Sequence, residues 1–560
     1  MFFCLNLFFF FFFFFFFFFF LGLYFYEYDT YFFFEWFFFF LNSCGFSLIF
    51  YFDWISCTFM SFVFLISGCV LFYSLGYMSG DLNLVRFYFI VYLFIFSMVL
   101  FILMPDLLCL LLGWDGLGLV SFCLVIYYNN ISSLISGILT LYMNRLGDVF
   151  LLLSIGWCLN YGSWHYMFYI SFFDDDYYLI IYLVLLSSFT KSAQFPFSIW
   201  LPAAMSAPTP VSSLVHSSTL VTSGIYLLIR FNYFLIYFDT YFLMVISLIT
   251  MFLSGLGACL ENDLKKIIAF STLSQLGFMF FVLSFGSLIL CYLHLLIHAI
   301  FKSLLFLCCG VFIHSFIGNQ DIRFMGGVVN QFPYISTMFF VSLICLCGFP
   351  FFSGFYSKDF ILELIFLKEM SFTFFFFFCL SVSLTIFYSF RLIYYLFYSS
   401  SYYFPFLSVN YNFYMVGSLF TLFTFCVFGG SFIFWLFEDE FFFIVEFEFS
   451  VLPLFFFFFF FFFSFIFKIS WFYLNYFYFY FFGSMFFMNF FSSNIFLGRF
   501  FGFVNLSYKL IDFGWLEYFT FGLLKLNFNW LSYFFDKFIL NLFKIYMLSF
   551  FFFFFFFFFF

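Results

Sequence analysis

Residues 289–317 have the sequence ILCYLHLLIHAIFKSLLFLCCGVFIHSFI, a hydrophobic stretch that contains three regularly spaced ionisable residues. The stretch is longer than the about 20 apolar residues that a membrane-spanning helix requires. His294, His298 and Lys302 follow one another at four-residue intervals, and residues four apart lie on the same face of a helix. The stretch therefore predicts a membrane-spanning helix with one ionisable face.

The composition indicates that the whole chain is built from such helices. Of the 560 residues, 67% are hydrophobic and only 8% are charged, whereas soluble domains average about 25% charged residues. This excludes a soluble globular enzyme, and the high hydrophobicity excludes a disordered chain. The net charge of −9 comes with no basic cluster longer than Lys265-Lys266, so nucleic acid is not an expected partner. We predict an all-α polytopic membrane protein surrounded by the lipid bilayer.

Polar residues, glycine and proline separate the chain into apolar runs of spanning length. At about 20 residues for each span, we expect about 14–16 transmembrane helices. The clearest runs are Phe2–Tyr26, Phe59–Tyr77, Arg86–Met104, Leu107–Tyr127, Ile131–Cys158, Tyr178–Phe195, Val211–Phe231, Tyr241–Cys259, Ile267–Phe285, Ile289–Ile317, Pro333–Leu346, Leu362–Phe397 and Phe413–Leu436.

The last part of the chain combines charge with aromatic sequence. Seven charged residues are spaced between Lys509 and Lys544, a pattern that suits an amphipathic helix lying along the membrane surface. Ordinary loops between spans explain the same spacing equally well. Residues Ile539–Phe560 are long enough for one more span.

The sequence predicts no metal or cofactor site. None of the fifteen cysteines has a partner at zinc or iron–sulfur spacing, and free cysteines in apolar helices usually behave as small hydrophobic residues. No glycine-rich nucleotide-binding motif follows a predicted strand.

Ten ionisable residues interrupt the apolar runs, and they carry the strongest functional signal. They are Asp115, Arg145, Asp148, Lys191, His216, His294, His298, Lys302, Lys358 and Arg391. A charge at the centre of a bilayer costs at least about 3 kcal/mol, so such residues usually face the protein interior and often mark proton or ion paths. Because histidine exchanges protons near pH 7, the column from His294 to Lys302 suits a proton relay, with a purely structural polar stripe as the alternative.

Two of the lysines lie beside segments rich in glycine and proline. Lys191 precedes Pro196, and Lys358 follows Gly348-Phe-Pro350. Interrupted membrane helices leave backbone groups free to line a wet cavity, and matched interruptions in two halves of a chain indicate inverted repeats around a transport site. The lysines are 167 residues apart (358 − 191), which predicts two multi-helix repeats with one broken helix each.

Several longer motifs recur along the polar parts of the chain. They are LGWDGLGLVS at 112–121, MNRLGD at 143–148, TKSAQ at 190–194, WLPAAM at 200–205, APTPVS at 207–212, HSST at 216–219, ENDLKKIIA at 261–269, HAIFK at 298–302 and GFYSKD at 354–359. These motifs resemble those of the chain 5 (subunit 5) family of mitochondrial NADH:ubiquinone oxidoreductase, respiratory complex I, and in particular its animal members. The resemblance is dense between about residues 50 and 365 and thin toward the C-terminus.

The resemblance implies a role for each buried ionisable residue. Members of this family resemble cation/proton antiporter subunits, and their proton path uses a carboxylate and a lysine that correspond here to Asp115 and Lys191. The other implied members of the path are His216, His294, His298, Lys302 and Lys358, with Arg145 and Asp148 as a second charged pair.

The resemblance also implies an organisation and a function. We expect N-terminal transmembrane helices at 1–104, half-channels at 105–250 and 251–400, and C-terminal helices with a lateral amphipathic helix and a final span at 401–560. The expected function is proton translocation across the inner mitochondrial membrane, as a subunit of NADH:ubiquinone reductase beside other membrane-arm subunits, especially the neighbouring antiporter-like ones. NADH, FMN, iron–sulfur clusters and ubiquinone would bind to other subunits. The alternatives are a stand-alone cation/proton antiporter and an inactive membrane scaffold, although the retained buried charges argue against the scaffold.

Overall fold

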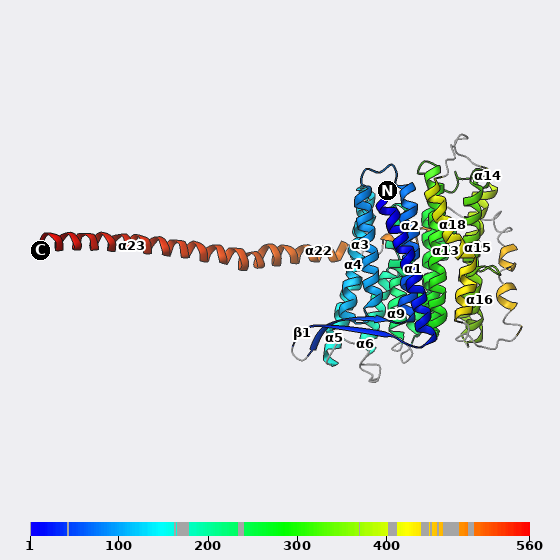
Figure 1. Ribbon diagram of the computed structural model, residues 1–560, viewed down its shortest axis with the longest axis horizontal. Helices are drawn as coiled ribbons and strands as arrows, with labels where there is room; N and C mark the ends of the chain where they lie inside the picture. Colours follow the sequence, from blue (N-terminus) through cyan, green and yellow to red (C-terminus); the bar gives the residue numbers. More distant parts are fainter. Residues whose placement is uncertain are drawn as a thin grey trace. The chain divides into compact units, whose positions relative to one another are not determined.

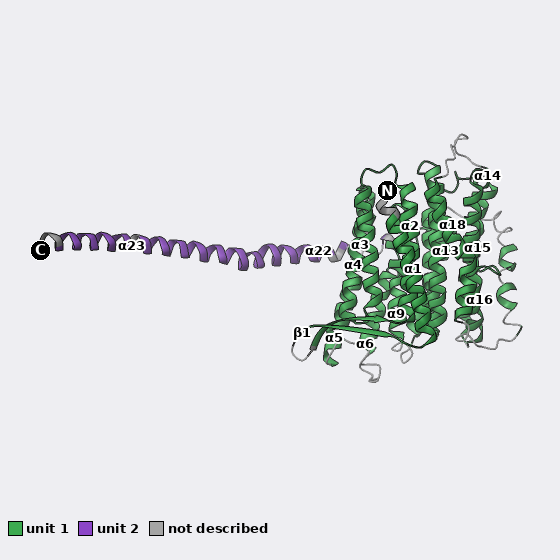
Figure 2. Cartoon of the chain, in the orientation of Figure 1, with its two compact units in different colours: residues 1–486 green, residues 487–560 purple. Residues whose placement is uncertain are grey.

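The structure of most of the chain is described by a computed structural model. The described residues are 2–41, 44–161, 164, 178–232, 240–368, 370–400, 412–437, 447, 451–455, 458–462, 481–490 and 498–559. They form two compact units, residues 1–486 and residues 487–560 (Figure 2).

The first unit is a bundle in which the long helices stand side by side (Figure 1). Twelve helices in the described part of the chain are long and apolar enough to cross a membrane, and three shorter apolar helices accompany them. The predicted polytopic helical fold is therefore confirmed. The helical elements of this unit are α1 (Phe2–Glu27), α2 (Trp54–Tyr77), α3 (Leu84–Leu103), α4 (Leu107–Val125), α5 (Ile131–Cys158), η1 (Leu159–Tyr161), α6 (Tyr178–Lys191), α7 (Trp200–Ala203), η4 (Ala204–Ser206), α8 (Thr209–Val211), η5 (Ser212–Thr219), α9 (Leu220–Arg230), α11 (Tyr241–Leu260), α12 (Leu264–Ser284), α13 (Leu288–Ser315), α14 (Val328–Gln331), α15 (Pro333–Cys347), α16 (Ser353–Leu367), α17 (Phe372–Ile393), η6 (Tyr394–Tyr398) and α18 (Phe413–Leu436).

Helix α13 lies in the core of the bundle. The most apolar part of α13 is completely buried, as is that of the continuous helical segment formed by α8, η5 and α9, whereas only half of the corresponding part of α3 and of α4 is buried. Helix α13 is thus surrounded by other parts of the protein on all sides. The ionisable side chains of α13 therefore face protein rather than lipid.

One antiparallel hairpin departs from the helical pattern expected from the sequence. Strand β1 (Phe32–Leu41) pairs with strand β2 (Cys44–Phe52), and the register shifts between Phe37 and Phe39. The hairpin crosses the end of the bundle (Figure 1). Phenylalanine and tyrosine favour strands, but the phenylalanine-rich sequence of the whole chain hides this local preference.

Two helices are interrupted close to the lysines that the sequence singles out. Helix α6 ends at Lys191, and the chain then turns through non-helical residues to α7. Helix α15 ends at Gly348, whose φ of +85° suits glycine, and α16 then begins at Ser353. The structure also divides the predicted run Leu362–Phe397, because residues up to 367 belong to α16 and α17 begins at Phe372.

The second unit is almost entirely helical. Its elements are α21 (Met488–Phe490), α22 (Gly498–Ser507), η10 (Tyr508–Leu516), η11 (Tyr518–Gly522) and α23 (Leu523–Phe559). The predicted surface helix and the predicted last span thus form one continuous helical segment. At 1.5 Å per residue, the apolar part from Phe501 to Phe556 is about 84 Å long, which is far more than the about 30 Å hydrocarbon core of a bilayer.

Candidate functional site

The first broken helix carries a completely buried lysine. Lys191 is the last residue of α6, and its Nζ atom donates a hydrogen bond of 3.0 Å to the carbonyl oxygen of Trp114 on α4. The same Nζ atom lies 4.8 Å from the centre of the Trp114 ring. An ideal Cβ atom on Gly118 would lie 3.3 Å from it, so this glycine allows the ammonium group to approach α4 closely.

Three charged side chains form a cluster next to Trp114. The indole Nε1 of Trp114 donates to Asp148 at 2.9 Å, and Arg145 donates to the second oxygen of Asp148 at 3.1 Å. Asp115 forms its ion pair with Arg145 at 3.6 Å rather than a contact with Lys191. Both carboxylates nevertheless act electrostatically on Lys191, and Asp148 contributes more than Asp115. Trp114 therefore connects the buried lysine to the charged pair.

His216 lies in the π-helical segment η5, after Pro208 and Pro210. A π-helical segment often marks a functional site, and proline removes a backbone donor that a regular helix would use. In the described structure neither nitrogen of the His216 ring has a hydrogen-bond partner, although the ring is buried. Segment η5 packs against α13. Buried polar groups without a protein partner usually bind water, so this position suits a hydrated path.

The predicted column on α13 is present in the core. The rings of His294 and His298 are 6.3 Å apart, and both are buried. Neither nitrogen of His298 has a partner among the described residues. One turn further, the Nζ atom of Lys302 donates to the Ser271 hydroxyl of α12 at 2.5 Å. The column thus combines imidazoles with a lysine that the structure pairs with a neutral group.

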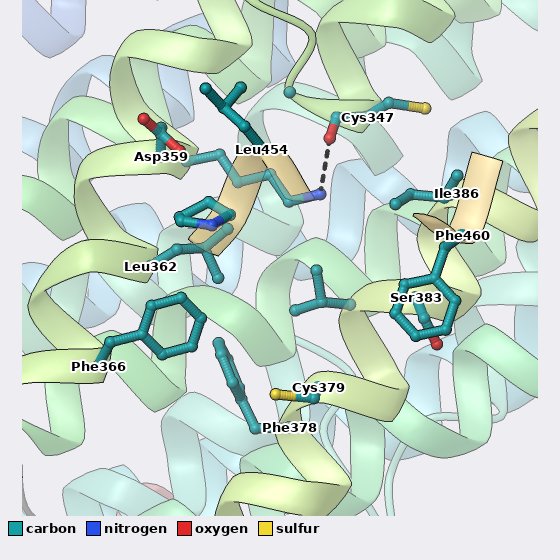
Figure 3. A pocket seen from close by; sticks show the side chains of 14 residues that line it. Cys347, Asp359, Leu362, Phe366, Phe378, Cys379, Ser383, Ile386, Leu454 and Phe460 are labelled. Carbon is teal, nitrogen blue, oxygen red and sulfur yellow. Dashed lines mark hydrogen bonds between the residues drawn. The ribbon is translucent and has the colours of Figure 1, made fainter. Parts of the chain in front are cut away.

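Lys358 connects the two parts of the second broken helix. It lies on α16, but its Nζ atom donates to the carbonyl oxygens of Leu346 and Cys347 at the end of α15, both at 3.3 Å, and to Thr385 on α17 at 3.2 Å. The C-terminal end of a helix carries a partial negative charge that attracts a cation. Figure 3 shows the bond to the Cys347 carbonyl beside a cavity of about 30 Å³, which is lined by residues that include Asp359. A cavity of this size holds about one water molecule.

Packing between the helices places these groups in one sequence across the bundle. Helix α6 packs against α5 and α9, segment η5 packs against α13, and α13 packs against α12 and α16. The order from Lys191 through His216 and Lys302 to Lys358 therefore follows neighbouring elements. The predicted residues come from separate parts of the chain, and the structure brings them into adjoining helices.

Sequence reasoning missed the neutral partners of the site. Ser271, Gln275, Ser357 and Thr385 hydrogen-bond to its histidines and lysines, and Trp114 bridges its first charged group. Serines recur in most of these helices, so their identity alone carries no signal. Only their distance in space from a lysine or histidine on another helix could have indicated them, and that distance is known only once the fold is known.

Two further cations, one buried and one partly buried, have a structural explanation. Lys265 on α12 donates to the carbonyl oxygen of Ala207 at 3.1 Å. Arg391 donates to the carbonyl oxygen of Glu261 at 2.6 Å and to the Asn262 side chain at 2.7 Å, beyond the end of α11. Among the described residues, no group of three histidine, cysteine or acidic side chains is arranged to hold a metal ion.

Comparison with known families covers most of the chain. The family model for the transmembrane region of NADH:quinone oxidoreductases and Mrp antiporters matches residues 104–385. The models for the N-terminus of complex I chain 5 and for the C-terminus of NADH dehydrogenase subunit 5 match residues 36–88 and 388–560. NADH-ubiquinone oxidoreductase chain 5 of Aedes aegypti is 45% identical over 98% of this chain and 96% of its own length. The chain belongs to the NADH-ubiquinone oxidoreductase chain 5 family.

Other relatives agree with this assignment. The chain 5 protein of Locusta migratoria is 53% identical over 70% of each chain. Among solved structures, the Mrp complex from Dietzia sp. has a similar fold, with a TM-score of 0.66 and 22% identity over 78% of this chain. The chain spans half the length of that Mrp chain. At this identity the likeness concerns the fold alone, and it shows that the bundle has the fold of that Mrp chain.

Proposed function

We propose that this chain translocates protons as a core membrane subunit of respiratory complex I in the inner mitochondrial membrane. The observation that carries the proposal is the succession of buried ionisable groups from Lys191 to Lys358 on adjoining helices. Five of them have at most 1% of their surface exposed: Lys191, His216, His294, His298 and Lys302. Buried groups of this kind are typical of proton paths in membrane proteins.

The hydrogen-bond partners of the two later lysines suit proton transfer better than a permanently charged side chain. Lys302 is held by a serine hydroxyl, and Lys358 by two carbonyls and a threonine. Neutral acceptors stabilise an ammonium group less than a carboxylate does, so the charged and neutral forms of such a lysine are closer in free energy. A small change in the surroundings then moves the proton.

The charged cluster around Trp114 is the proposed trigger. Asp148, which accepts from the Trp114 indole, and Asp115, which pairs with Arg145, both act electrostatically on Lys191. Movement or neutralisation of these carboxylates would weaken the hold of Lys191 on its proton, which would pass toward His216 and Lys302. Lys358 would be the member on the exit side. In this proposal the electron-transfer groups, including NADH, FMN, iron–sulfur clusters and ubiquinone, bind to other subunits.

The proposed partners are other membrane-arm subunits, especially neighbouring antiporter-like ones. The side chains of Asp115 and Arg145 are 41% and 44% exposed on this chain. An ion pair that faces hydrocarbon is costly. A neighbouring subunit with polar groups at this flank of α4 and α5 would remove that cost, so the exposure of the pair supports the proposal. The long helix of the second unit exposes aromatic residues along its length. It therefore also needs neighbouring subunits or the membrane to cover these residues.

A stand-alone cation/proton antiporter is the competing function, and its fold would be the same. The C-terminal match to subunit 5 at residues 388–560 favours the complex I subunit. The mass and subunit composition of the native detergent-solubilised assembly test this choice. A complex that contains this chain and oxidises NADH supports the proposal, and an assembly made only of antiporter subunits would contradict it.

A further inference from the structure

His294 is held on both sides by side chains of neighbouring helices. Its Nδ1 atom lies 2.9 Å from the hydroxyl oxygen of Ser357 on α16, and its Nε2 atom lies 3.3 Å from the amide oxygen of Gln275 on α12. All three side chains are buried. The imidazole therefore has a defined orientation between the α13 column and the second broken helix.

The chemistry of the two partners determines which ring nitrogen exchanges protons. An amide oxygen only accepts hydrogen bonds, so the Nε2 atom of His294 must donate to Gln275 and carry a hydrogen. In neutral imidazole the Nδ1 atom is then an acceptor, and it accepts from the Ser357 hydroxyl. Because a hydroxyl both donates and accepts, Ser357 can pass a proton on, whereas the Gln275 oxygen cannot.

The Ser357 hydroxyl oxygen lies closer to the His294 ring, at 2.9 Å, than to the carbonyl oxygen of Gly354 in its own helix. A serine in a helix commonly donates to a carbonyl three or four residues earlier. Ser342, in the other half of the same broken helix, does so to Phe339 at 2.8 Å, whereas the distance from Ser357 to the carbonyl of Gly354 is 3.4 Å. The longer bond leaves the hydroxyl free to alternate between Gly354 and His294.

Building on the proposed function, we propose that the Ser357 hydroxyl carries protons between His294 and the Lys358 site, and that Gln275 is the positioning residue that keeps His294 in the required tautomer. Ser357 and Lys358 are successive residues of α16, and the charge of Lys358 acts on His294. Ser357 thus links the column on α13 to the broken helix.

The transfer is balanced at each atom. Protonated His294 gives its Nδ1 proton to the Ser357 oxygen, and Ser357 gives its original hydroxyl proton to a water molecule. That water passes one of its own protons to the neutral amine of Lys358, so His294 becomes neutral and Lys358 becomes an ammonium ion. Each oxygen gains one O–H bond and loses one, and no electron is transferred. The Ser357 hydroxyl then turns to donate to Nδ1 again.

Replacement of Ser357 in the intact complex tests the proposal. Proton pumping in reconstituted vesicles is measured for each amount of assembled complex. For Ser357→Ala we expect pumping about tenfold slower, less than the about 100-fold contribution of a typical proton-transfer group, because water can partly replace a lost hydroxyl. Ser342→Ala is the matched control, and its pumping should be normal because its hydroxyl bonds to its own helix.

Two further pairs of variants separate the effect of the hydrogen-bonding group from the effect of packing. Ser357→Thr keeps the hydroxyl, and Ser357→Val has nearly the same shape without it, so pumping should be higher in the threonine variant even if both assemble poorly. Gln275→Glu keeps an accepting oxygen and should pump faster than Gln275→Met. Equal pumping within each pair would show that these residues only pack.

The same series distinguishes this inference from the proposed function. If Lys302→Met pumps normally, the relay itself is absent. If Lys302→Met is impaired while Ser357→Ala pumps like Ser342→Ala, the relay stands and the proposed carrier role of Ser357 is overturned. Impairment in both Lys302→Met and Ser357→Ala, with rescue by Ser357→Thr, supports the inference.

Discussion

The ammonium nitrogen of Lys191 lies 3.0 Å from the carbonyl oxygen of Trp114, so a completely buried cation is held by a neutral backbone group. The side chain of the same tryptophan donates to Asp148. Trp114 is therefore an intermediary between a lysine in a broken helix and a carboxylate on α5. A shift of the tryptophan would alter both contacts together.

This arrangement predicts that Asp148 matters more to Lys191 than Asp115 does. Asp148→Asn removes the carboxylate that acts more strongly on Lys191 but keeps an acceptor for the Trp114 indole, so assembly should be normal and pumping should fall by about tenfold or more. Asp115→Asn should have a smaller effect, because Asp115 acts less strongly on Lys191 and is partly exposed. Proton pumping in vesicles, measured for each amount of assembled complex, tests both variants. A larger effect of Asp115→Asn would contradict this ranking.

Lys302 is the next residue whose titration can be tested. Lys302→Met keeps the length of the side chain and removes the proton, so the subunit should remain abundant while pumping falls by about 100-fold. NADH:ubiquinone turnover should slow because it is coupled to pumping. Lys302→Arg should not restore pumping, since a guanidinium group does not release its proton in proteins. Loss of the subunit itself would instead favour a structural polar stripe.

The sequence was sufficient to predict some elements of the bundle closely. The run Ile131–Cys158 coincides with α5, and the column on α13 follows from spacing alone, because both depend on local hydrophobic pattern and helix geometry. The run Leu362–Phe397 is long enough for two helices, and the structure divides it between α16 and α17; the charged pair Lys368-Glu369 stands between the two helices in the sequence.

Contacts between distant helices could not be predicted in the same way. The serine that binds Lys302 is one of many in the chain, and only the packing of α12 against α13 selects Ser271. The partner of Asp115 is likewise determined by how α4 packs against α5, which places Arg145 nearer than Lys191. Tertiary packing chooses among chemically equivalent partners, and a single sequence does not encode that choice in any local pattern.

The close approach of the two parts of the second broken helix predicts a sensitive glycine. An ideal Cβ atom on Gly354 would lie 1.8 Å from the carbonyl oxygen of Cys345, a backbone atom that cannot move away alone. Gly354→Ala should therefore destabilise the fold by about 3 kcal/mol, the upper part of the range for overpacking. It should also impair pumping, because the carbonyls that hold Lys358 follow Cys345. Gly156→Ala on α5 is the control, since a Cβ atom there meets nothing within 4 Å, and equal thermal stability of the two variants would contradict the prediction.

Asp53, immediately before α2, gives a prediction about pH. It caps that helix through Ser56 and forms an ion pair with Arg230 at 2.5 Å. Burial alone would raise the pKa of Asp53, but Arg230 and the hydrogen bonds from Ser56 hold it below its usual value. A lowered pKa stabilises the fold above the ordinary value of about 4, and this stabilisation is lost as the pH falls through the lowered pKa.

Replacement of Asp53 should therefore matter at neutral pH and less in acid. Asp53→Asn should destabilise the fold by about 3 kcal/mol, as expected when one partner of a buried ion pair is removed. Thermal unfolding in detergent should show a constant difference from wild type above about pH 5 that shrinks below about pH 4. Asp321→Asn serves as the control, because its partner Arg323 is exposed and such surface pairs contribute about 1 kcal/mol at most. A difference that persists unchanged in acid would show that the ion pair is not its source.

The helix of the second unit predicts that the chain requires partners. Its side chains are exposed from end to end, including Trp515 and Trp530 at 64% and 68%. A helix of this length is too long to span one bilayer along its whole length. It therefore needs other subunits or the membrane surface along which to lie. Truncation before Tyr508 should leave the helices of the first unit inserted but prevent stable assembly of the membrane arm, while the redox reaction of the remaining arm continues. Native electrophoresis with an NADH oxidation assay measures both.

A shorter truncation supplies the control for this prediction. Removal of residues 550–560 deletes only phenylalanine, which offers apolar surface but no hydrogen bond, ion pair or defined shape that a partner could recognise. The part from Tyr508 to Lys544 contains the charged residues and the two tryptophans that could pair with specific groups on other subunits. Assembly should therefore survive the shorter truncation and fail after the longer one. A fully assembled and pumping complex after truncation before Tyr508 would show that the helix is dispensable, whereas failure of both truncations would place the decisive contacts at the end of α23.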